Sequence, residues 1–553
     1  MSHRAWCGRR QSRSERIVKR LQKTPEGYLL PLRVGEELAL SGRLELRVLR
    51  GGVELWGARL AVSRSFQPVV VPPWCASPRL LATRGEAKCD EGEAEEVKQF
   101  LATRNWPVVL CLRSHGSCEQ LRESLALPAT RPRLRAHRSW LSLARHFLDQ
   151  VVRSPSEAKA AVLVVMGAKG VGKSTCCRFL VNRLLSELHE VYFLETDLGQ
   201  PELGPPGVVT LHRLVRPLLQ TPHAEQHQHQ RICAFLAGST TPAFHPALYT
   251  ACVGAAFEAF QAETEAAGRK PVLVVNSHGW VTGLGLELVQ EICGLVGAQL
   301  VLRLLPAAGA PGAAAAARAR RLGVRRTALA RCGPLARALK QRRPEFGPGL
   351  VLVDLDSAVP ARGVAPLAAQ LRWLRLAQHF DPARDPCEPA QALAMQDFFG
   401  RVPRWRLRLA GLRFGLVAGH LLRSEVEAAL TGVAVALCTS EEPTSTRCDL
   451  VLVEPHEAPI KFVAYAFVHC FDFKAGEVVV YSPCTAQQLE SVDLVLRGEV
   501  AWEPNSTRNL KLGDGRPSPL QPYSAPWLLE GMGVGSRVVT TKGNLKRRRL
   551  RKI

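Results

Sequence analysis

In the middle of the chain, short uninterrupted apolar runs alternate with longer stretches in which apolar residues recur every three or four positions. Uninterrupted runs of this length are typical of strands buried on both faces, and the longer stretches are typical of amphipathic helices. This alternation predicts an α/β fold in which helices cover both faces of a parallel sheet. The expected strands are residues 161–167, 190–197, 232–238, 271–277, 298–304 and 349–355.

The pattern changes on both sides of this central region. Short alternating apolar runs, broken by glycines, predict a mainly β domain at each end of the chain. We also expect a helix over residues 138–152. The expected divisions are a basic disordered leader (1–26), an N-terminal β-rich domain (27–135), the α/β domain (136–390), a C-terminal β-rich domain (395–540) and a basic tail (541–553).

The charge balance points to a polyanionic partner. The 553 residues include 73 Lys and Arg against 49 Asp and Glu, a formal net charge of +24. Nucleic acid fits this surplus better than a membrane, because we find no apolar run of about 18 residues or more without charge, Pro or Gly. The 16 cysteines contain no C-x-x-C pair, and we interpret them as reduced side chains of an intracellular protein.

A glycine-rich loop follows the first of the central strands. Its residues are Gly167, Ala168, Lys169, Gly170, Val171, Gly172, Lys173, Ser174 and Thr175, and the first eight match G-x-x-x-x-G-K-[ST]. Such a loop turns its backbone N–H groups toward the phosphates of a nucleotide, while the Lys reaches the β- and γ-phosphates and the Ser ligates Mg²⁺. Because the loop also precedes a predicted helix, we predict a nucleotide-binding P-loop with Lys173 as a catalytic cation and Ser174 as a magnesium ligand.

The class of P-loop protein is narrowed by what accompanies the loop. We find no N-K-x-D motif of a GTPase and no LSGGQ motif, and Asn276 stands where a Walker B carboxylate pair is expected. Asp197, at the end of a predicted strand, is placed to orient an acceptor hydroxyl and take its proton, or to hold Mg²⁺. The alternative is that Asp197 only stabilises the turn before Gly199.

Three further segments resemble one family. "FLETDLGQPELGPPG" (193–207), "FLAGSTTPAFHPALY" (235–249) and "PVLVVNSHGWVTGLGLELV" (271–289) are similar to segments of the polynucleotide 5′-hydroxyl kinases, the Clp/Grc group of P-loop kinases. The resemblance covers about residues 155 to 385. The flanking β domains and the basic tail resemble the nucleolar branch that processes pre-ribosomal RNA.

The resemblance implies roles for further residues. Asp197 would deprotonate the RNA 5′-hydroxyl with Gln200 beside it, and Thr240 and Thr241 would form a clasp near the phosphates. Trp280 would stack on the terminal base, although a core aromatic explains it equally well. The family's lid places arginines on the transferring phosphoryl group, for which the candidates here are Arg362 and Arg372.

The expected function is therefore an ATP- and Mg²⁺-dependent kinase of RNA 5′-hydroxyl ends, acting on an internal transcribed spacer of pre-rRNA during maturation of the large ribosomal subunit. The resemblance further implies a complex with the endonuclease subunit that cuts this spacer, and a nuclear, nucleolar location without a membrane partner. Two alternatives remain open, an ATPase switch in ribosome assembly and an RNA-binding scaffold without phosphoryl transfer to RNA. Three interpretations of the basic tail remain open: a nuclear localisation signal, an arm that contacts RNA, or a solvated terminus.

Overall fold

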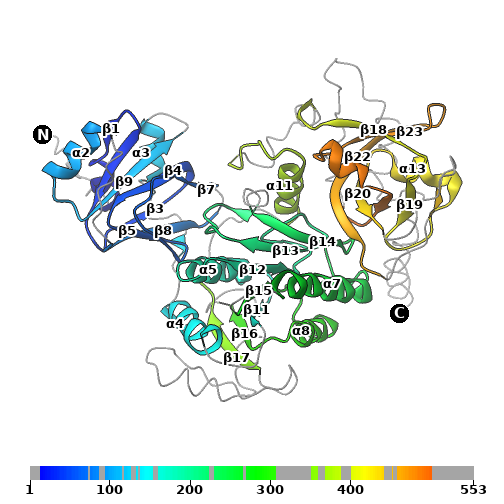
Figure 1. Cartoon of the computed structure of the whole chain (residues 1–553), viewed down its shortest axis with the longest axis horizontal. Helices are drawn as coiled ribbons and strands as arrows, with labels where there is room; N and C mark the ends of the chain where they lie inside the picture. The colour runs from blue at the N-terminus through cyan, green and yellow to red at the C-terminus, as the bar shows by residue number, and fades with distance from the viewer. Residues whose placement is uncertain are drawn as a thin grey trace, which may run out of the picture.

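The structure is a computed structural model. It describes residues 13–72, 75–85, 94–114, 118–125, 127, 133–134, 138–153, 160–222, 229–265, 270–306, 350–358, 368–387, 400–440, 451–452 and 458–500. Figure 1 shows three units that follow one another along the chain, with the central unit below and a β-rich unit at each side above it.

Two sheets form the N-terminal unit. Its elements are α1 (Arg13–Val18), β1 (Gln22–Thr24), β2 (Gly27–Leu32), β3 (Glu37–Ala39), β4 (Gly42–Arg50), β5 (Gly52–Leu55), β6 (Ala58–Leu60), β7 (Gln67–Val71), β8 (Ser77–Thr83), α2 (Glu95–Thr103), β9 (Val108–Ser114), α3 (Cys118–Leu125) and β10 (Arg133–Leu134). One sheet has the strand order β1-β2-β9-β4-β7 and the other β10-β8-β5-β6, with β3 beside β8. Leucine and valine side chains of both sheets share one core.

Part of the leader that we expected to be disordered is ordered. Residues 13–18 form α1 and residues 22–24 form β1, which pairs with β2. Ile17 and Val18 are buried in the core of the N-terminal unit. Burial of these two side chains offsets the conformational entropy that is lost when the segment becomes ordered, and the basic composition gave no sign of such burial. The prediction is therefore corrected for this stretch.

The central unit contains a sheet whose first five strands are parallel. Its strands are β11 (Ala161–Gly167), β12 (Val191–Glu195), β13 (Val208–Leu214), β14 (Gln230–Leu236), β15 (Val272–Asn276), β16 (Leu300–Leu305) and β17 (Val351–Asp356). They follow the order β17-β16-β11-β15-β12-β13-β14, with parallel pairing from β17 to β12. Because the carboxyl ends of β11, β12 and β15 meet at one edge, the loops that follow them are neighbours.

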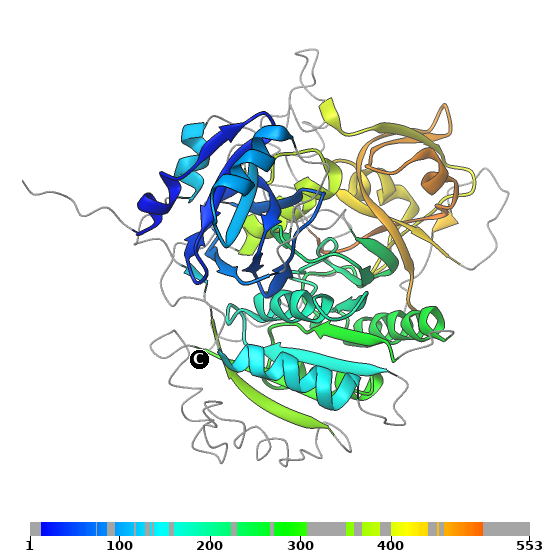
Figure 2. The ribbon, with the colours of Figure 1, turned by 60° about the vertical axis from the view of Figure 1, so that its left-hand side comes forward.

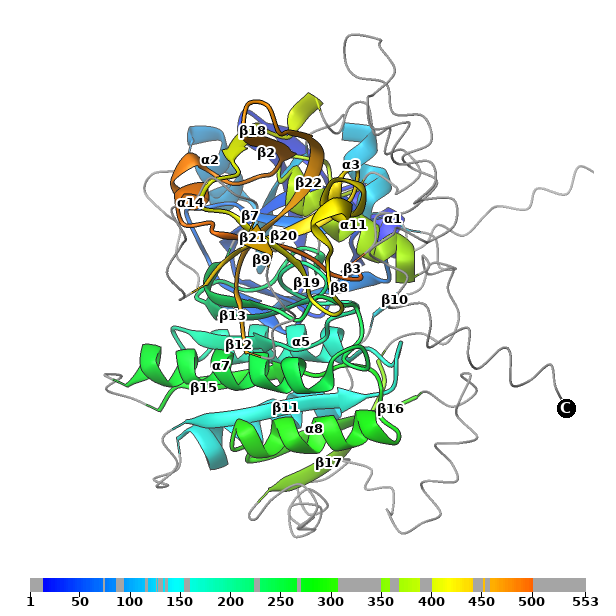
Figure 3. The same cartoon turned by 90° about the vertical axis from the view of Figure 1, so that its right-hand side faces the viewer.

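Helices cover both faces of this sheet, which confirms the predicted α/β class (Figure 3). The helices are α4 (Arg138–Phe147), continued by the π-helix Leu148–Val152, α5 (Lys173–Leu185), α7 (Pro246–Thr264), α8 (Leu284–Leu295) and α11 (Ala368–Phe380). α4 and α5 pack on the face that carries Leu163 and Val274. α7, α8 and α11 contribute to the core on the opposite face, which carries Val164 and Val275.

The sheet is not wholly parallel, in contrast to the prediction. β13 runs antiparallel to β12, and β14, which we had expected among the parallel strands, runs antiparallel to β13. We had also not predicted β13 as a strand. A parallel neighbour needs a crossover connection, which is usually a helix, whereas the segment 196–207 between β12 and β13 contains no helix.

The C-terminal unit continues the same sheet. Its elements are β18 (Arg404–Arg408), β19 (Arg413–Leu416), a 3₁₀ turn (Arg423–Glu425), α13 (Val426–Leu430), β20 (Ala434–Thr439), β21 (Val451–Leu452), β22 (Lys461–Asp472), β23 (Glu477–Tyr481), α14 (Ala486–Glu490) and β24 (Leu494–Arg497). β14 pairs with β22 at Phe235 and Lys461, which joins the two units into one 14-stranded sheet. The core around α7 and α11 includes Tyr465 and Phe467 of β22, so it extends across the predicted boundary at residues 390–395.

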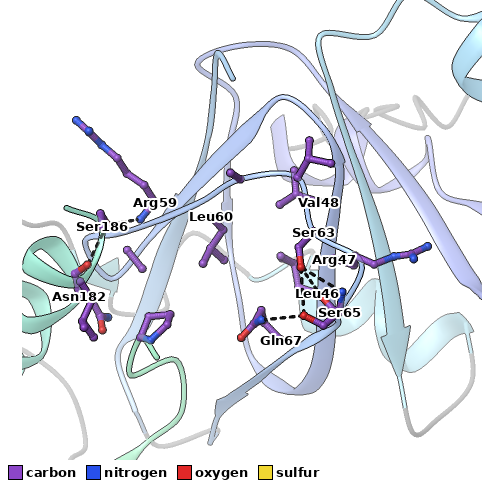
Figure 4. A pocket seen from close by; sticks show the side chains of 15 residues that line it. Leu46, Arg47, Val48, Arg59, Leu60, Ser63, Ser65, Gln67, Asn182 and Ser186 are labelled. Atoms are coloured by element: carbon purple, nitrogen blue, oxygen red, sulfur yellow. Dashed lines mark hydrogen bonds between the residues drawn. The ribbon is translucent and has the colours of Figure 1, made fainter. Parts of the chain in front are cut away.

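The N-terminal unit lies against α5 through the turn between β5 and β6 (Figure 2). Asn182 of α5 donates its side-chain N–H to the carbonyl of Trp56, at 3.0 Å, and the backbone N–H of Arg59 donates to Ser186 Oγ, at 3.1 Å. Beside this seam is a cavity of about 280 Å³, between β4, β6 and the end of α5 (Figure 4). Its polar groups bond to one another, as Ser63 and Ser65 do at 3.1 Å, so we interpret it as part of the seam.

Two expectations from composition can be compared with the structure. Within the described residues, none of the helices has the length and apolar character needed to cross a membrane. The cysteines that the structure describes are not joined in disulfides, and Cys176, Cys177, Cys252 and Cys293 are buried as we expected for small apolar side chains.

Candidate active site

A cavity of about 580 Å³ lies at the carboxyl ends of β11, β12 and β15. It is bounded by the loop before α5, the loop after β12, the loop after β14, the loop after β15 and one side of α11. The lining residues are Lys169, Gly170, Gly172, Lys173, Ser174, Thr175, Asp197, Gly199, Gln200, Glu202, Pro222, Thr240, Thr241, Pro242, His278, Gly279, Trp280, Leu371, Arg372 and Arg375. Every predicted site residue lines this cavity except Gly167, Ala168 and Val171 of the P-loop and Arg362. Arg362 lies outside the described residues.

The P-loop has the backbone conformation that an anion cradle needs. Gly170 and Gly172 adopt positive φ angles of 78° and 88°, a region that residues with a Cβ rarely occupy. Gly172 is the N-cap of α5, so the helix begins at Lys173. Its unpaired N–H groups and the positive end of its dipole therefore face the cavity, where a phosphate group would be stabilised.

Lys173 is buried at this helix start, with 6% of its surface exposed. Burial lowers the pKa of its ammonium group, while Asp197, Cys177 and Glu195 act in the opposite direction. A cation held in such a place has lost much of its water and interacts strongly with any phosphate that enters. The lysine and the Asp197 carboxylate therefore lie on the same cavity and influence each other.

Asp197 follows β12 and orders its own loop. Its Oδ1 accepts the backbone N–H groups of Gly199 and Gln200, at 3.0 and 3.1 Å. This is the turn-stabilising arrangement that the alternative interpretation expected. It occupies only one carboxylate oxygen, and Oδ2 has no hydrogen bond to the residues that the structure describes. Asp197 therefore stabilises a turn and also offers an oxygen to the cavity.

Glu195, two residues earlier, is the member of the site that the sequence analysis passed over. It is fully buried, and Asn276 Nδ2 donates to both of its oxygens, at 2.9 and 3.1 Å. The backbone N–H groups of Asp197 and Glu202 also donate to it. Burial, together with the nearby Asp197 charge, raises the pKa of Glu195 to about 8, although these donors act to lower it. Its position in the quoted E-T-D run was the available signal.

Asn276 links this carboxylate to the P-loop. Its Nδ2 lies 3.4 Å from Ser174 Oγ, on the first turn of α5. We had noted Asn276 only as a missing Walker B acid, whereas the acid is supplied by Glu195 of the neighbouring strand, in register with Asn276. A serine hydroxyl with carboxylates at hand is the oxygen set that Mg²⁺ prefers, so Ser174 and Asp197, with Glu195 behind them, fit the predicted ion. No group of three or more His, Cys, Asp or Glu forms a separate metal site in the described part of the chain.

The loop after β12 is fixed from behind by a buried ion pair. Arg178 of α5 donates two hydrogen bonds to Glu202 Oε1, one of them at 2.6 Å through Nε. The two side chains are 5% and 2% exposed. The guanidinium also lies over the ring of Trp56 from the N-terminal unit, 4.8 Å from its centroid. The acceptor side of the cavity is thereby connected to α5 and to the N-terminal unit.

Thr240 and Thr241 stand across the cavity from this loop. A Cβ on Gly199 would lie 3.0 Å from the carbonyl of Thr240, so the two loops are in close contact. The Thr241 backbone N–H donates to Ser239 Oγ, at 3.3 Å. Ser239 in turn donates to Glu499, at 3.4 Å, near the end of the described C-terminal unit. The threonine loop is therefore held by that unit.

Trp280 fits both interpretations that we left open. It lines the cavity, and it also packs against the central core and against Gly285 of α8. The neighbouring His278 is buried, and its Nδ1 accepts the backbone N–H of Trp280 at 3.3 Å. Burial lowers the pKa of His278 to about 4, so the ring is neutral at pH 7 and its proton is on Nε2. We had not singled out His278.

α11 brings two arginines to the cavity rather than one. Arg372, predicted as a lid residue, lies on the lining, and so does Arg375 three positions later on the same face of the helix. Burial lowers the pKa of the Arg375 guanidinium, while the nearby carboxylates act to raise it. These carboxylates belong to Glu202, Glu195 and Asp197. The i, i+3 spacing from Arg372 was the available signal for Arg375. Arg362, the other predicted lid arginine, stays a prediction.

Comparison with known proteins gives one family. The model of the family described as the mRNA cleavage and polyadenylation factor CLP1 P-loop matches residues 167–306. The polynucleotide 5′-hydroxyl-kinase GRC3 of Gibberella zeae is 28% identical over 318 residues, which are 53% of this chain and 43% of that protein. The polynucleotide 5′-hydroxyl-kinase NOL9 of Homo sapiens is 34% identical over 135 residues, 24% of this chain and 18% of that protein. The chain thus spans less than half the length of these relatives.

A solved structure has a similar fold. In the wild-type Clp1p–Pcf11p (454–563) complex, one chain matches with a TM-score of 0.53 and 13% identity, over 85% of this chain and 97% of that chain. The match includes the β-rich units as well as the central one, because it covers more of this chain than the central unit contains. At this identity it bears on the fold alone.

Proposed function

Since the chain belongs to the family of polynucleotide 5′-hydroxyl kinases that carry the CLP1-type P-loop, we propose that it transfers the γ-phosphate of ATP to the 5′-hydroxyl end of an RNA strand. One observation carries the proposal. The Asp197 carboxylate lines the same cavity as Lys173 and Ser174 of the phosphate cradle. A phosphate cradle is needed for ATP hydrolysis and for phosphoryl transfer alike. A carboxylate base on the same cavity, with room for a nucleotide, favours transfer to a hydroxyl group.

In the proposed reaction, the oxygen of the 5′-hydroxyl attacks the γ-phosphorus, and the bond from this phosphorus to the β–γ bridging oxygen breaks. Asp197 Oδ2 takes the proton of the hydroxyl, and ADP leaves. Lys173, Arg372 and Arg375 stabilise the charge that spreads over the transferring group. Ser174 and Asp197, with Glu195 behind them, would hold the Mg²⁺ ion, which would neutralise charge on the phosphates.

The acceptor strand would enter between the loops after β12 and β14. Gln200, Thr240 and Thr241 would contact its terminal nucleotide, and Trp280 would stack on the base, a contact worth about 1–3 kcal/mol. The two ordered loops are fixed by Glu202 on one side and by Ser239 on the other, which supports a preformed acceptor position.

The wider role follows from the relatives. GRC3 and NOL9 are named as polynucleotide 5′-hydroxyl kinases, and the net charge of +24 supports RNA as the substrate. We propose that the substrate is an internal transcribed spacer of pre-rRNA in the nucleolus, freshly cut by an endonuclease subunit that binds this chain. The presence of Pcf11p on the Clp1p chain supports a fold that binds a protein partner.

The test is transfer of labelled γ-phosphate from ATP to a 5′-hydroxyl RNA oligonucleotide. Lys173→Ala should lower the rate by about 10²–10³, because a preorganised cation is lost. Asp197→Asn should lower it by about 10²–10⁴ and leave ATP binding in place, because an amide cannot take the proton. The matched control is Asp149→Asn, since Asp149 is an exposed carboxylate outside the cavity that pairs only with Arg153 among the described residues.

Two outcomes would reject the proposal. ATP turnover without label on RNA would instead support an assembly switch driven by hydrolysis. Failure to bind ATP would support a scaffold whose P-loop is a relic. Labelling that survives Asp197→Asn would remove Asp197 from the role given to it here.

A further inference from the structure

A row of arginines lies on β18, outside the cavity. Arg404, Arg406 and Arg408 alternate with Trp405 and Leu407, and the strand has the burial pattern of three exposed residues separated by two half-buried ones. Trp405 and Leu407 pack on the core of the C-terminal unit. The period of two in a strand therefore directs all three guanidinium groups to the opposite face.

β18 lies at the rim of the C-terminal unit, where in the described structure it pairs only with β23 (Figure 1). Arg406 pairs with Glu477, at 3.0 Å, and is still 56% exposed. Within the described residues, the side chains of Arg404 and Arg408 form neither a hydrogen bond nor an ion pair. Glu477 and Asp472, which is opposite it on β22, are two acids against three arginines, so this edge keeps a net positive charge.

The row shares its sheet face with the helix that carries the lid arginines. Arg404 is opposite Tyr481 in the β18–β23 register, and Tyr481 belongs to the core into which α11 packs Trp373 and Phe380. Directly after α11, Asp381 pairs with Arg401, at 3.4 Å, three residues before Arg404. α11 and β23 therefore contribute to the same core, and the Asp381–Arg401 pair connects the end of α11 with the segment that precedes β18.

We propose that this row, Arg404, Arg406 and Arg408, binds the phosphodiester backbone of the RNA strand behind its 5′-hydroxyl end, an inference that rests on the proposed kinase function. Side chains two positions apart on a strand are separated by roughly 6.6–6.8 Å. This is twice the roughly 3.4 Å rise per nucleotide of a stacked strand. The row therefore matches alternate phosphates of a stacked strand or successive phosphates of a more extended one.

The distance from the cavity sets the length of RNA that can use the row. From Arg372 to the end of α11 is roughly 12 Å, and from Arg401 to Arg404 is roughly 10 Å. At about 3.4 Å per nucleotide, the row begins about six nucleotides from the reacting end in a stacked strand.

An acidic protein segment would also be attracted to the row, and an edge strand can carry charge merely to prevent pairing with another strand. RNA is favoured because the row has a regular spacing that matches the phosphates of a strand. A guanidinium group can also bind a phosphate through two hydrogen bonds.

The test uses the full chain with Arg404, Arg406 and Arg408 all changed to Gln. Binding of fluorescent 5′-hydroxyl RNAs of 3 and 12 nucleotides is measured by anisotropy between 50 and 200 mM salt, and their phosphorylation is measured in parallel. The control changes Arg16, Arg104 and Arg122, three exposed arginines of the N-terminal unit, to Gln and alters the net charge equally. A second variant places Lys at all three β18 positions.

We expect the Gln variant to bind the 12-nucleotide RNA about five- to tenfold more weakly and to lose about two from the salt slope, since single strands contribute roughly 0.7 per phosphate. The Lys variant should retain most of the binding, and the 3-nucleotide RNA should be phosphorylated at the wild-type rate by all variants.

The proposal is overturned if the β18 and control variants weaken binding equally, or if the 3-nucleotide RNA is affected as strongly as the longer one. Displacement of the RNA by poly-glutamate as effectively as by unlabelled RNA would assign the row to an acidic protein. If the Gln variant self-associates and its RNA binding is unchanged, the charges serve only to prevent β18 from pairing with a strand of another molecule. If no RNA is phosphorylated by the wild type but the length-dependent binding persists, the kinase function fails and the binding row stands.

Discussion

Glu195 and Asp197 are separated by a single residue in the chain but have different surroundings. Glu195 is enclosed on all sides and accepts hydrogen bonds from Asn276 and two backbone N–H groups. Asp197 uses one oxygen for its own turn and lines the cavity. Burial therefore makes Glu195 a group that positions Asn276 and the loop, while Asp197 is accessible to a substrate.

His278 gives a pH-dependent prediction. Its pKa is about 4 in the folded chain against an ordinary 6.5, so as the pH falls below 6.5 the unfolded state takes up a proton before the folded state does. Stability is complete above pH 6.5 and is lost as the pH falls toward 4, by up to about 3 kcal/mol for this residue. Urea unfolding at pH 7.5 and 4.5 should show that His278→Gln reduces the acid-induced loss by up to this amount.

The control for this experiment is His189→Gln, because His189 is exposed. It should leave the acid-induced loss unchanged. His212, whose pKa burial lowers to about 3, contributes to the loss in all three proteins, so a residual effect is expected in each. An acid-induced loss that is identical in wild type and His278→Gln would contradict the burial argument.

α5 connects the cavity with the N-terminal unit. Its first turn forms the phosphate cradle, Arg178 on its second turn holds Glu202, and Asn182 further along binds the turn that carries Trp56. The same helix also packs on β15 and β12. A displacement of this one helix would therefore alter both sides of the cavity.

Arg178→Met should strongly destabilise the chain, by about 3–5 kcal/mol, because it leaves the buried Glu202 without a counter-charge. The double variant Arg178→Met, Glu202→Gln should recover part of this loss, since no buried charge remains. Chemical denaturation measures both. The comparison pair is Arg79–Glu37, which is 2.9 Å apart with side chains 37% and 39% exposed, and here Arg79→Met should cost about 1 kcal/mol or less.

α8 gives a second test, through Gly285. A Cβ at this position would lie 2.4 Å from the Trp280 ring and from its carbonyl, so Gly285→Ala must displace Trp280. We expect a destabilisation of about 1–3 kcal/mol and a higher KM for RNA with a smaller change in KM for ATP. Gly294→Ala in the same helix meets no atom within 4 Å and should be neutral or stabilising by up to about 1 kcal/mol. Equal behaviour of the two variants would contradict the packing argument.

The three units share contacts that make them one structure rather than separate modules. The core around α7 and α11 contains side chains from both the central sheet and β22, and Tyr465 of β22 donates its hydroxyl to the carbonyl of Pro206 at 2.8 Å. Figures 1 and 3 show α11 above the central sheet and beside the C-terminal unit. Arg372 and Arg375 are therefore carried by a helix that packs against residues of both units.

This shared core predicts cooperative unfolding of the central and C-terminal units. Tyr465→Phe removes the hydrogen bond to Pro206, and the buried carbonyl left without it should cost about 1–3 kcal/mol. Calorimetry should show the single transition of these units moving to lower temperature as a whole. A transition that splits, with the ATP-stabilised part unchanged, would mean that the two units unfold independently.

Several features of the fold and site followed from local sequence. The strand β11, the glycines at positive φ and the start of α5 lie where the P-loop pattern predicted them, because phosphate cradling imposes a local backbone geometry that only certain residues adopt. The α/β class followed from hydrophobic periodicity, because the spacing of apolar residues along the chain indicates which segments are strands and which are helices. Asp197, Arg372 and the threonine pair could be named because their segments resemble a known family.

The tertiary structure decided what depends on distant partners. The direction of β13 and β14, the burial of Ile17 in a basic leader and the core shared across residues 390–395 depend on contacts between segments far apart in the chain. Glu195 became a buried group only because Asn276, 81 positions later, lies beside it on the neighbouring strand. Local residue types fix backbone conformations and motifs, whereas desolvation and pairing are properties of the packed chain, and these determine which polar side chains form the site.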